Sequence, residues 1–408
     1  MPETAQPAVL LVLLVGAVFI LVALIRGLLD PVGIPPLVGY LLLGLVLRVA
    51  DGQWGFLAVP AIEHTFEFLA DIGIVILLFR VGLETNPGKL VRKLPRSSVI
   101  FAGNLLVAAL FGYVTAYYGL GLAAIPSLIV ATALSATSVG VSVAAWQEVG
   151  ALNTGNGHLL VNVAELDDIA AVALFALLFA VIPVLSGGNS VPWGLVGTTA
   201  GSFLGKLALF TAGCILFARY LAPYMTLLGV RLEPHPRPMM TVVGVGFVIA
   251  AIGGWLGLSL AVGALFAGLV FSRDPGAWEH VSSFDLLYRY VAPFFFIEIG
   301  LLLNPEALLL GLELGGVLLA VAILGKLAGT ILPALGVTSW PGAVLLGVSM
   351  VPRAEIAMLI MHQGRQTVPG AVSDELYAGM VVVTAGTCIL APLVLRPLLQ
   401  RWPQTVSD

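Results

Sequence analysis

Long apolar runs are the feature that most restricts how this chain can fold. The 408 residues are 59% hydrophobic and only 10% charged, whereas soluble domains average about 25% charged residues. The runs last about 20 residues without period-2 alternation, which is the length of a membrane-spanning helix. Each such helix satisfies its own backbone hydrogen bonds in lipid. The sequence therefore predicts an all-α polytopic membrane protein rather than a β-barrel.

Hydropathy divides the chain into thirteen predicted transmembrane helices joined by short loops. The first run lacks a basic start and a clear cleavage site, so we expect it to be retained. No soluble domain is expected, and the two cysteines lie in apolar runs as small core residues. The predicted segments are residues 8–28, 35–50, 67–83, 97–118, 123–146, 157–183, 193–220, 238–254, 256–272, 287–303, 314–334, 340–362 and 375–398.

Lysine and arginine predict the orientation of these helices, because loops rich in them stay on the cytoplasmic side. Basic residues gather on one side if the N-terminus lies outside and the C-terminus is cytoplasmic, with Arg365 as the main exception. The net charge of −4 includes no basic patch that indicates nucleic acid. The residues that set this orientation are Arg26, Lys89, Arg92, Lys93, Arg96, Arg219, Arg231, Arg237, Arg273, Arg289, Arg396 and Arg401.

Two halves of the chain share short motifs. Residues 80–87 read Arg-Val-Gly-Leu-Glu-Thr-Asn-Pro and residues 298–305 read Glu-Ile-Gly-Leu-Leu-Leu-Asn-Pro, a constant offset of 218 residues (298 − 80). Residues 39–44 and 263–268 both begin and end with glycine, at an offset of 224 (263 − 39). Six helices in each half and one between them give the halves opposite orientations. The pattern predicts an inverted repeat, which is typical of transporters.

Corresponding helices of the two halves carry interruptions. Residues 133–140 read Ala-Leu-Ser-Ala-Thr-Ser-Val-Gly, and residues 349–355 read Ser-Met-Val-Pro-Arg-Ala-Glu. Proline removes a backbone donor, and non-helical backbone at membrane depth survives only against protein or a water-filled cavity. The broken ends carry partial charges that suit ions. We therefore expect two discontinuous helices, with Ser135, Thr137 and Ser138 in one, and Arg353 and Glu355 in the other.

Asp167 and Asp168 are adjacent carboxylates in the middle of the sixth predicted helix. A charge at that depth costs a few kcal/mol or more, so intramembrane acids are usually functional. Burial and mutual repulsion favour their protonated forms, and a carboxylate reached by water then binds either a proton or a hard cation. An alternative is a pair locked in structural salt bridges.

Lys326 lies in the middle of the eleventh predicted helix, and its natural partner is one of the two aspartates. It either releases a proton when a cation arrives or serves as a static counter-ion. Arg353 and Glu355 are predicted to balance each other or the half-helix ends. Glu165 is either an added ligand or an interfacial carboxylate. Arg80 and Glu298 occupy matching repeat positions with opposite charges, which indicates either an ion pair or a selectivity role.

The chain resembles the second monovalent cation:proton antiporter family over its whole length, especially the NapA-like sodium/proton antiporters. The resemblance rests on residues 36–44 (Pro-Leu-Val-Gly-Tyr-Leu-Leu-Leu-Gly), residues 77–84 (Leu-Leu-Phe-Arg-Val-Gly-Leu-Glu), residues 134–140, the Asp167-Asp168 pair, Lys326 and residues 352–355 (Pro-Arg-Ala-Glu). The chain departs from the family pattern at Arg80, Glu298 and Ala354.

The resemblance implies an NhaA/NapA-like antiporter fold with two crossing discontinuous helices. Residues 1–96 and 235–305 would form the panel and dimerisation domain, residues 97–185 and 306–402 the core ion-translocation domain, and residues 190–234 the linker helix of a single transporter unit. It also implies a homodimer in the prokaryotic inner membrane, elevator-type alternating access, and electrogenic exchange of Na⁺ or Li⁺ for H⁺. Asp168 would be the main cation ligand and Asp167 the partner of Lys326, with no cofactor beyond the transported ions.

Other functions stay open at this stage. Potassium/proton exchange uses the same fold, and so do symporters of the bile-acid type, which do not need an Asp-Asp pair with a membrane lysine. An ion channel is a further alternative. An intramembrane aspartyl protease requires two aspartates on separate helices, usually one in a Gly-x-Gly-Asp setting, whereas here the two aspartates are adjacent and no such setting occurs.

Overall fold

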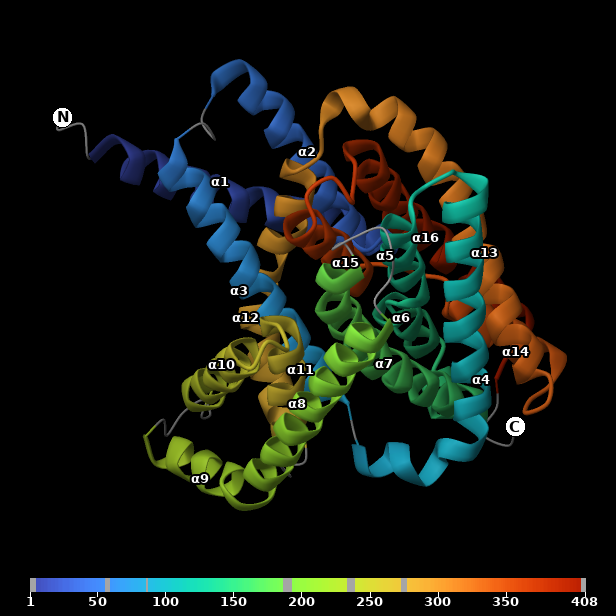
Figure 1. Cartoon of the computed structure of the whole chain (residues 1–408). Coiled ribbons are helices and arrows are strands. Elements are labelled where there is room, and N and C mark those ends of the chain that lie inside the picture. Colours follow the sequence, from blue (N-terminus) through green and yellow to red (C-terminus); the bar gives the residue numbers. More distant parts are fainter. Residues whose placement is uncertain are drawn as a thin grey trace. The chain divides into compact units, whose positions relative to one another are not determined.

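The computed structural model describes residues 5–55, 59–85, 87–185, 193–232, 239–272 and 277–404. Within these ranges, all regular secondary structure is helical (Figure 1). The chain separates into two compact units, each made from two stretches of sequence. Unit 1 contains residues 1–86 and 205–305, and unit 2 contains residues 87–204 and 306–408.

Unit 1 is built around α3, which packs against both α11 and α12, while α2 packs along α12. Glycine allows these helices to approach closely. A Cβ at Gly44 would collide with the carbonyl of Ile297, and one at Gly82 would collide with that of Leu265. The helices of this unit are α1 (Ala5–Leu29), α2 (Pro36–Trp54), α3 (Pro60–Glu84), α9 (Ala222–Leu232), α10 (Met239–Trp255), α11 (Leu260–Phe271) and α12 (Ala277–Leu301).

Unit 2 is built around α13, which packs along α4 on one side and α16 on the other (Figure 1). Helix α8 (Trp193–Tyr220) is divided between the units: its residues up to 204 belong to unit 2, and those from 205 on belong to unit 1. The helices of unit 2 are α4 (Pro87–Val114), α5 (Ala124–Ser135), α6 (Gly140–Glu148), α7 (Gly155–Leu185), α13 (Leu308–Ala334), α14 (Trp340–Ser349), α15 (Glu355–Thr367) and α16 (Asp374–Arg401).

Both predicted interruptions are present. The segment predicted over residues 123–146 is split into α5 and α6, and that over residues 340–362 into α14 and α15. Pro352 cannot donate a backbone hydrogen bond, and Ala354 leaves helical geometry at φ −142°, ψ −104°. In the first break Ala136 is extended, at φ −65°, ψ 147°. Each of the thirteen predicted segments overlaps a helix, and α9 is an additional one.

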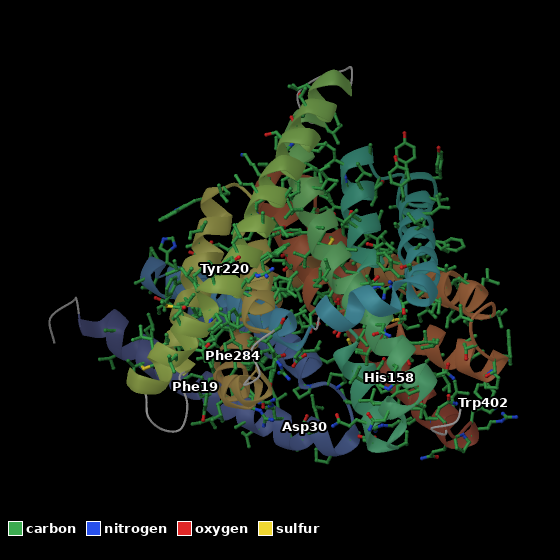
Figure 2. All side chains as sticks on the ribbon, turned by 90° about the horizontal axis from the view of Figure 1, so that it is seen from below. Phe19, Asp30, His158, Tyr220, Phe284 and Trp402 are labelled. Atoms are coloured by element: carbon green, nitrogen blue, oxygen red, sulfur yellow. The ribbon has the colours of Figure 1, made fainter. Side chains whose placement is uncertain are left out.

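Large apolar side chains are exposed along several helices, α1, α4, α8 and α13 among them. Figure 2 shows many all-carbon side chains that extend outward from the ribbons. Seven of the described helical segments are long and apolar enough to cross a membrane, the broken pair α5–α6 counted as one. Such a surface is what a helix presents to lipid. The full count of thirteen spans stays a prediction.

Candidate functional site

Asp167 lies in the interior of unit 2, on α7, and its side chain is fully buried. It is about twelve residues into the helix, roughly 18 Å along the axis. Its Oδ1 accepts a hydrogen bond of 2.8 Å from Asn104 Nδ2 on α4. The same oxygen lies 3.8 Å from Lys326 Nζ on α13, which is also fully buried. The structure thus brings Lys326 together with the aspartate that the family resemblance assigned to it.

Lys326 makes its shortest hydrogen bonds to the break between α5 and α6. Its Nζ donates to the carbonyl oxygen of Ser135 at 2.6 Å and to Thr137 Oγ1 at 2.7 Å. Ser135 is the last residue of α5, where helix carbonyls lack intrahelical partners and carry partial negative charge. The ammonium therefore stabilises both the end of α5 and the carboxylate of Asp167.

Arg353 lies in the break between α14 and α15 and is fully buried. Its Nη1 donates to the carbonyl oxygens of Met350, Val351 and Pro352 at 3.1, 2.9 and 3.2 Å. In the described part of the chain, Arg353 Nε and Nη2 make no hydrogen bond. Of the two predicted roles, Arg353 balances a half-helix end rather than Glu355.

Ser138 and Glu355 connect the two breaks. Ser138 Oγ donates to Glu355 Oε2 at 2.6 Å, and the Ser138 amide donates to the Pro352 carbonyl oxygen at 2.9 Å. Glu355 is the first residue of α15, where the helix dipole favours a carboxylate. The backbone amide that the first break exposes thus satisfies a carbonyl of the second break.

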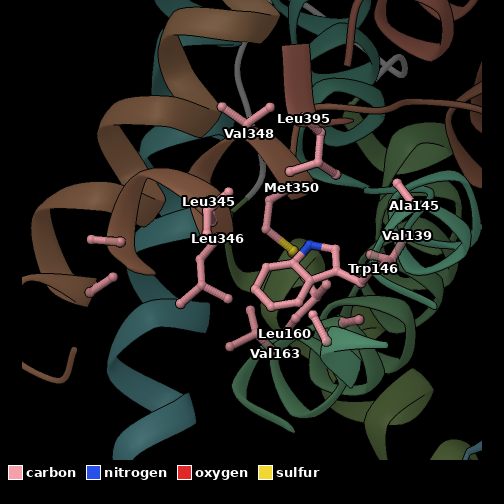
Figure 3. Packing of buried hydrophobic residues seen from close by; sticks show 14 of the residues in the cluster. Val139, Ala145, Trp146, Leu160, Val163, Leu345, Leu346, Val348, Met350 and Leu395 are labelled. Carbon is pink, nitrogen blue, oxygen red and sulfur yellow. The ribbon is translucent and has the colours of Figure 1, made fainter. Parts of the chain in front are cut away.

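Trp146 of α6 forms another connection between the broken helices. Its Nε1 donates to Ser349 Oγ at the end of α14 at 2.8 Å, and Ser142 Oγ donates to the Ser349 carbonyl at 2.8 Å. Figure 3 shows the indole among apolar side chains that include Leu160, Leu346 and Met350. The indole is fully buried, so it holds α6 against α14 by packing as well as by a hydrogen bond.

The start of α7, at the opposite end of unit 2 from the Asp167 site along that helix, is held by hydrogen bonds of the Asn156 side-chain amide. Asn156, near the start of α7, donates to Gln404 Oε1 at 2.8 Å and accepts from Thr338 Oγ1 at 2.6 Å. His158 and Trp402 mark this end in Figure 2. The start of α7 is therefore anchored to the segment that follows α16, which helps to fix the position of Asp167 along the helix axis.

Asp168 and Glu165 are only partly buried, in contrast to Asp167, which lies between them in sequence. Adjacent residues on a helix point about 100° apart, so Asp167 and Asp168 face different surroundings. Asp167 faces α4 and α13, where Asn104 and Lys326 lie. Asp168 is the more accessible of the two predicted ligands.

Arg80 and Glu298, which belong to unit 1, do not form the predicted ion pair. Arg80 instead pairs with Glu84 at 2.8 Å and with Asp285 at 3.1 Å, and its guanidinium lies 4.3 Å from the centre of the Tyr288 ring. No ion pair between Arg80 and Glu298 occurs in the described residues. Of the two alternatives, the ion pair is therefore wrong, because equivalent repeat positions on α3 and α12 need not face each other, and the selectivity role stays a prediction.

Asn104 and Thr330 are site residues that sequence reasoning missed. Thr330 Oγ1 donates to Asn104 Oδ1 at 3.1 Å, and both side chains are fully buried. A single asparagine within the apolar run of residues 97–118 was the available signal, since an amide at membrane depth needs partners.

A buried aspartate–lysine pair beside two broken helices is the kind of site that defines secondary cation transporters. The model of one such family, described as "Sodium/hydrogen exchanger, transmembrane", matches residues 17–401. The chain therefore belongs to this family of cation:proton antiporters, which are integral membrane transporters.

Individual relatives agree with this assignment. The chain is 27% identical over 401 residues to the "High-affinity Na(+)/H(+) antiporter NhaS3" of Synechocystis sp., covering 95% of this chain and 83% of that protein. It is 27% identical over 371 residues to "K(+) efflux antiporter 6" of Arabidopsis thaliana, covering 89% of this chain and 59% of that protein. The sodium proton antiporter MjNhaP1 of Methanocaldococcus jannaschii has the same fold, with a TM-score of 0.69 at 16% identity and 97% coverage of both chains.

Proposed function

We propose that this cation:proton antiporter exchanges Na⁺ or Li⁺ for H⁺, with Asp168 as the main cation ligand. The observation that carries the proposal is the contrast between neighbouring carboxylates. Asp167 is fully buried beside Lys326, whereas Asp168 is partly exposed. A partly exposed carboxylate suits an ion that must enter and leave, and a fully buried one suits a permanent partner for the lysine.

Competition at Asp168 couples the two ions. A carboxylate in a low-dielectric site is stabilised by either a proton or a hard cation, and each displaces the other. Cation binding adds positive charge near Lys326, which favours release of the lysine proton. One proton from the carboxylate and one from the lysine make the exchange electrogenic. Ser135, Thr137 and Ser138 supply polar groups from the first break.

Potassium/proton exchange is the second candidate, because a K⁺ efflux antiporter is among the relatives. The carboxylate chemistry serves either cation. The protease alternative loses support, since both aspartates lie on the single helix α7.

The division into units supports an elevator mechanism. The predicted panel domain, residues 1–96 and 235–305, resembles unit 1, and the predicted core domain, residues 97–185 and 306–402, resembles unit 2. The boundaries between the units fall after residues 86, 204 and 305, and the second of these lies within the predicted linker of residues 190–234. The groups of the Asp167–Lys326 site all belong to unit 2. A compact unit that carries the whole site can move as one body across the membrane.

Reciprocal glycine contacts support the inverted repeat and hence this architecture. The repeat relates Gly44 to Gly268 at an offset of 224 residues (268 − 44) and Gly82 to Gly300 at 218 (300 − 82). In unit 1, Gly44 packs against Gly300 and Gly268 packs against Gly82. One contact therefore becomes the other when the halves are exchanged. We also propose a homodimer in the prokaryotic inner membrane, with the N-terminus outside and the C-terminus in the cytoplasm.

Transport in proteoliposomes tests the proposal. Vesicles with an internal proton gradient should lose it when Na⁺ or Li⁺ is added, and less so with K⁺. Asp168→Asn should abolish the response, because the amide neither binds a proton nor neutralises a cation. The exposed Glu313→Gln on α13 is the matched control, since it removes one carboxylate away from the site. No cation-dependent loss of the gradient, or full activity in Asp168→Asn, would contradict the proposal.

A further inference from the structure

We propose that α9 is an interfacial helix that lies along the membrane surface and is bound there by anionic phospholipids. The inference concerns the lipid partner of unit 1, and it is independent of which cation is transported. It assigns a role to a helix that hydropathy did not predict. An exposed apolar face, a position directly after a spanning helix, and nearby arginines all point to this partner.

One face of α9 carries large apolar side chains that nothing in the described part of the chain covers. Tyr224, Leu227 and Leu228 follow the i, i+3, i+4 spacing of a single helix face, and they are 70%, 52% and 44% exposed. Tyr220 and Leu221, just before the helix, are also exposed and extend this face. The helix itself packs against α10 within unit 1. It therefore has one side on protein and one side open.

α9 is too short to cross a bilayer, and it does not continue α8. Its 11 residues rise about 16 Å, whereas the hydrocarbon core is roughly 30 Å thick. α8 already has the length and hydropathy of a complete span. Pro223 has no amide hydrogen and so interrupts the helical hydrogen bonds, and Figure 1 shows α9 leaving the direction of α8 at this point. The chain therefore turns where α8 reaches the membrane surface.

The open face of α9 continues a lipid-facing surface. On α8, Leu209, Ile215 and Leu216 are exposed, and such side chains on a spanning helix face lipid. Tyr220 and Leu221 connect this surface with the open face of α9. An apolar face in water is unfavourable, whereas the boundary between headgroups and acyl chains accommodates an amphipathic helix. Lipid therefore covers this face.

The polar groups beside this face suit the headgroup layer. Tyr220 and Tyr224 combine an apolar ring with a polar hydroxyl, and tyrosine is enriched at this depth. Arg219 is exposed, and its guanidinium lies 5.8 Å from the centre of the Tyr220 ring. Residues 219–237 contain three arginines and one acid, a net charge of +2 (3 − 1). Such a charge attracts the phosphates of anionic lipids.

This contact bears on how the chain joins its two units. α8 passes from unit 2 to unit 1 between residues 204 and 205, and α9 follows its unit 1 end. An end held at the membrane surface fixes the depth of that part of α8. The orientation predicted from the basic residues puts this end on the cytoplasmic side, where anionic lipids give the leaflet a negative surface potential.

Spin labels in lipid vesicles test what covers α9. A nitroxide is attached to Leu227→Cys in the full chain, reconstituted in phosphatidylcholine mixed with phosphatidylglycerol. Cys214 and Cys388 are both buried, so the unsubstituted chain measures background labelling. A nitroxide at Leu209→Cys is the matched reference, because Leu209 is exposed on the spanning helix α8.

Oxygen dissolved in the membrane and a water-soluble nickel chelate report the depth of each label. We expect the label at Leu227→Cys to collide more with oxygen than with the chelate, at a shallower depth than the label at Leu209→Cys. Collision with the chelate alone would place α9 in water. Access to neither reagent would mean that protein, such as a second copy of the chain, covers this face. Either of these two results would overturn the proposal.

Local quenching by brominated lipids tests the preference for anionic headgroups. A fluorophore on Leu227→Cys reports whether dibrominated phosphatidylglycerol or dibrominated phosphatidylcholine lies beside it. Phosphatidylglycerol should quench more strongly in the chain that retains Arg219. Arg219→Gln should reduce this preference about fivefold, the factor that corresponds to one basic residue near a negatively charged surface.

Arg48→Gln is the matched control. Arg48 is also exposed on a helix of unit 1, but it has a carboxylate partner in Asp51, at 3.7 Å. This substitution should leave the lipid preference beside Leu227→Cys unchanged. Equal quenching by the two lipids when Arg219 is present, or an equal loss of preference in Arg48→Gln, would contradict the anionic partner. Neither measurement needs cation flux, so its outcome is separate from that of the proposed exchange.

Discussion

The two helix breaks of unit 2 solve the same electrostatic problem in different ways. Each leaves the carbonyl end of a short helix buried, and one buried cation donates hydrogen bonds at each of these ends. The end of α5 receives Lys326, which comes from another helix and also faces Asp167. The end of α14 receives Arg353, which belongs to the break itself.

The difference lies in what each cation can do. A lysine ammonium loses its proton readily when buried, whereas a guanidinium remains charged in practically every protein environment. The first break is therefore capped by a side chain that can lose its positive charge, Lys326, and the second by one that keeps its charge, Arg353. We infer that ion binding alters the α5–α6 break, while the α14–α15 break serves as the fixed side of the site.

The largest expected effect comes from Arg353→Leu. The change leaves the carbonyls of residues 350–352 without the guanidinium donor in a fully buried position. Each unsatisfied buried acceptor costs about 1–3 kcal/mol, so we expect a loss of about 3 kcal/mol or more and little folded protein after solubilisation. Fluorescence-detected size exclusion at increasing temperature measures this. A melting curve like that of the wild type would show that the second break needs no permanent cation.

Lys326→Leu should destabilise less, and in a way that depends on pH. The variant removes the cap of α5 and the counter-charge of Asp167, but Asn104 still donates to the carboxylate. A buried carboxylate that has lost its counter-charge is destabilised in its charged form only. The variant should therefore melt closest to the wild-type temperature at acid pH, where the lost cap of α5 is the main defect, and progressively lower as the pH rises.

Arg353→Leu provides the control for that pH dependence, because carbonyl groups do not titrate in this range. Its melting temperature should be lowered similarly at acid and at alkaline pH. If both variants show the same pH profile, the distinction between a dischargeable and a permanent cap is wrong.

The sequence predicts the helices and the site to different extents. Apolar length located every predicted segment, and Pro352 with the small polar residues of 135–138 located both breaks, because these features act locally along the chain. Hydropathy could not place the start of α4, which begins at Pro87, ten residues before the predicted segment, in a polar and basic stretch. It also missed α9, which is short and is followed by a polar, proline-rich stretch of sequence.

Contacts between helices were harder to predict than the helices themselves. Charge paired Lys326 with one of the two aspartates, since a lysine and an aspartate are each costly in lipid without a partner, and the family resemblance chose Asp167. The same reasoning failed for Arg80 and Glu298, because Asp285 and Glu84 lie nearer to the guanidinium. Asn104 and Trp146 carry no charge and match no motif, so only the crossing of helices far apart in sequence shows their roles.

The smallest expected effect concerns the hydrogen bond that joins the two broken helices. Trp146→Phe keeps most of the aromatic packing but removes the donor to Ser349 Oγ. The loss should be about 1 kcal/mol, and Ser349→Ala should cost a similar amount. Because both variants delete the same bond, their effects on the free energy of unfolding should overlap rather than add, with a coupling of about 1 kcal/mol in the double mutant.

Since Ser349 ends α14, next to the carbonyls that Arg353 caps, that coupling should not vary with pH. Additive effects would mean that α6 holds the second break by packing alone, and a coupling that weakens at high pH would mean that the second break responds to proton release as well.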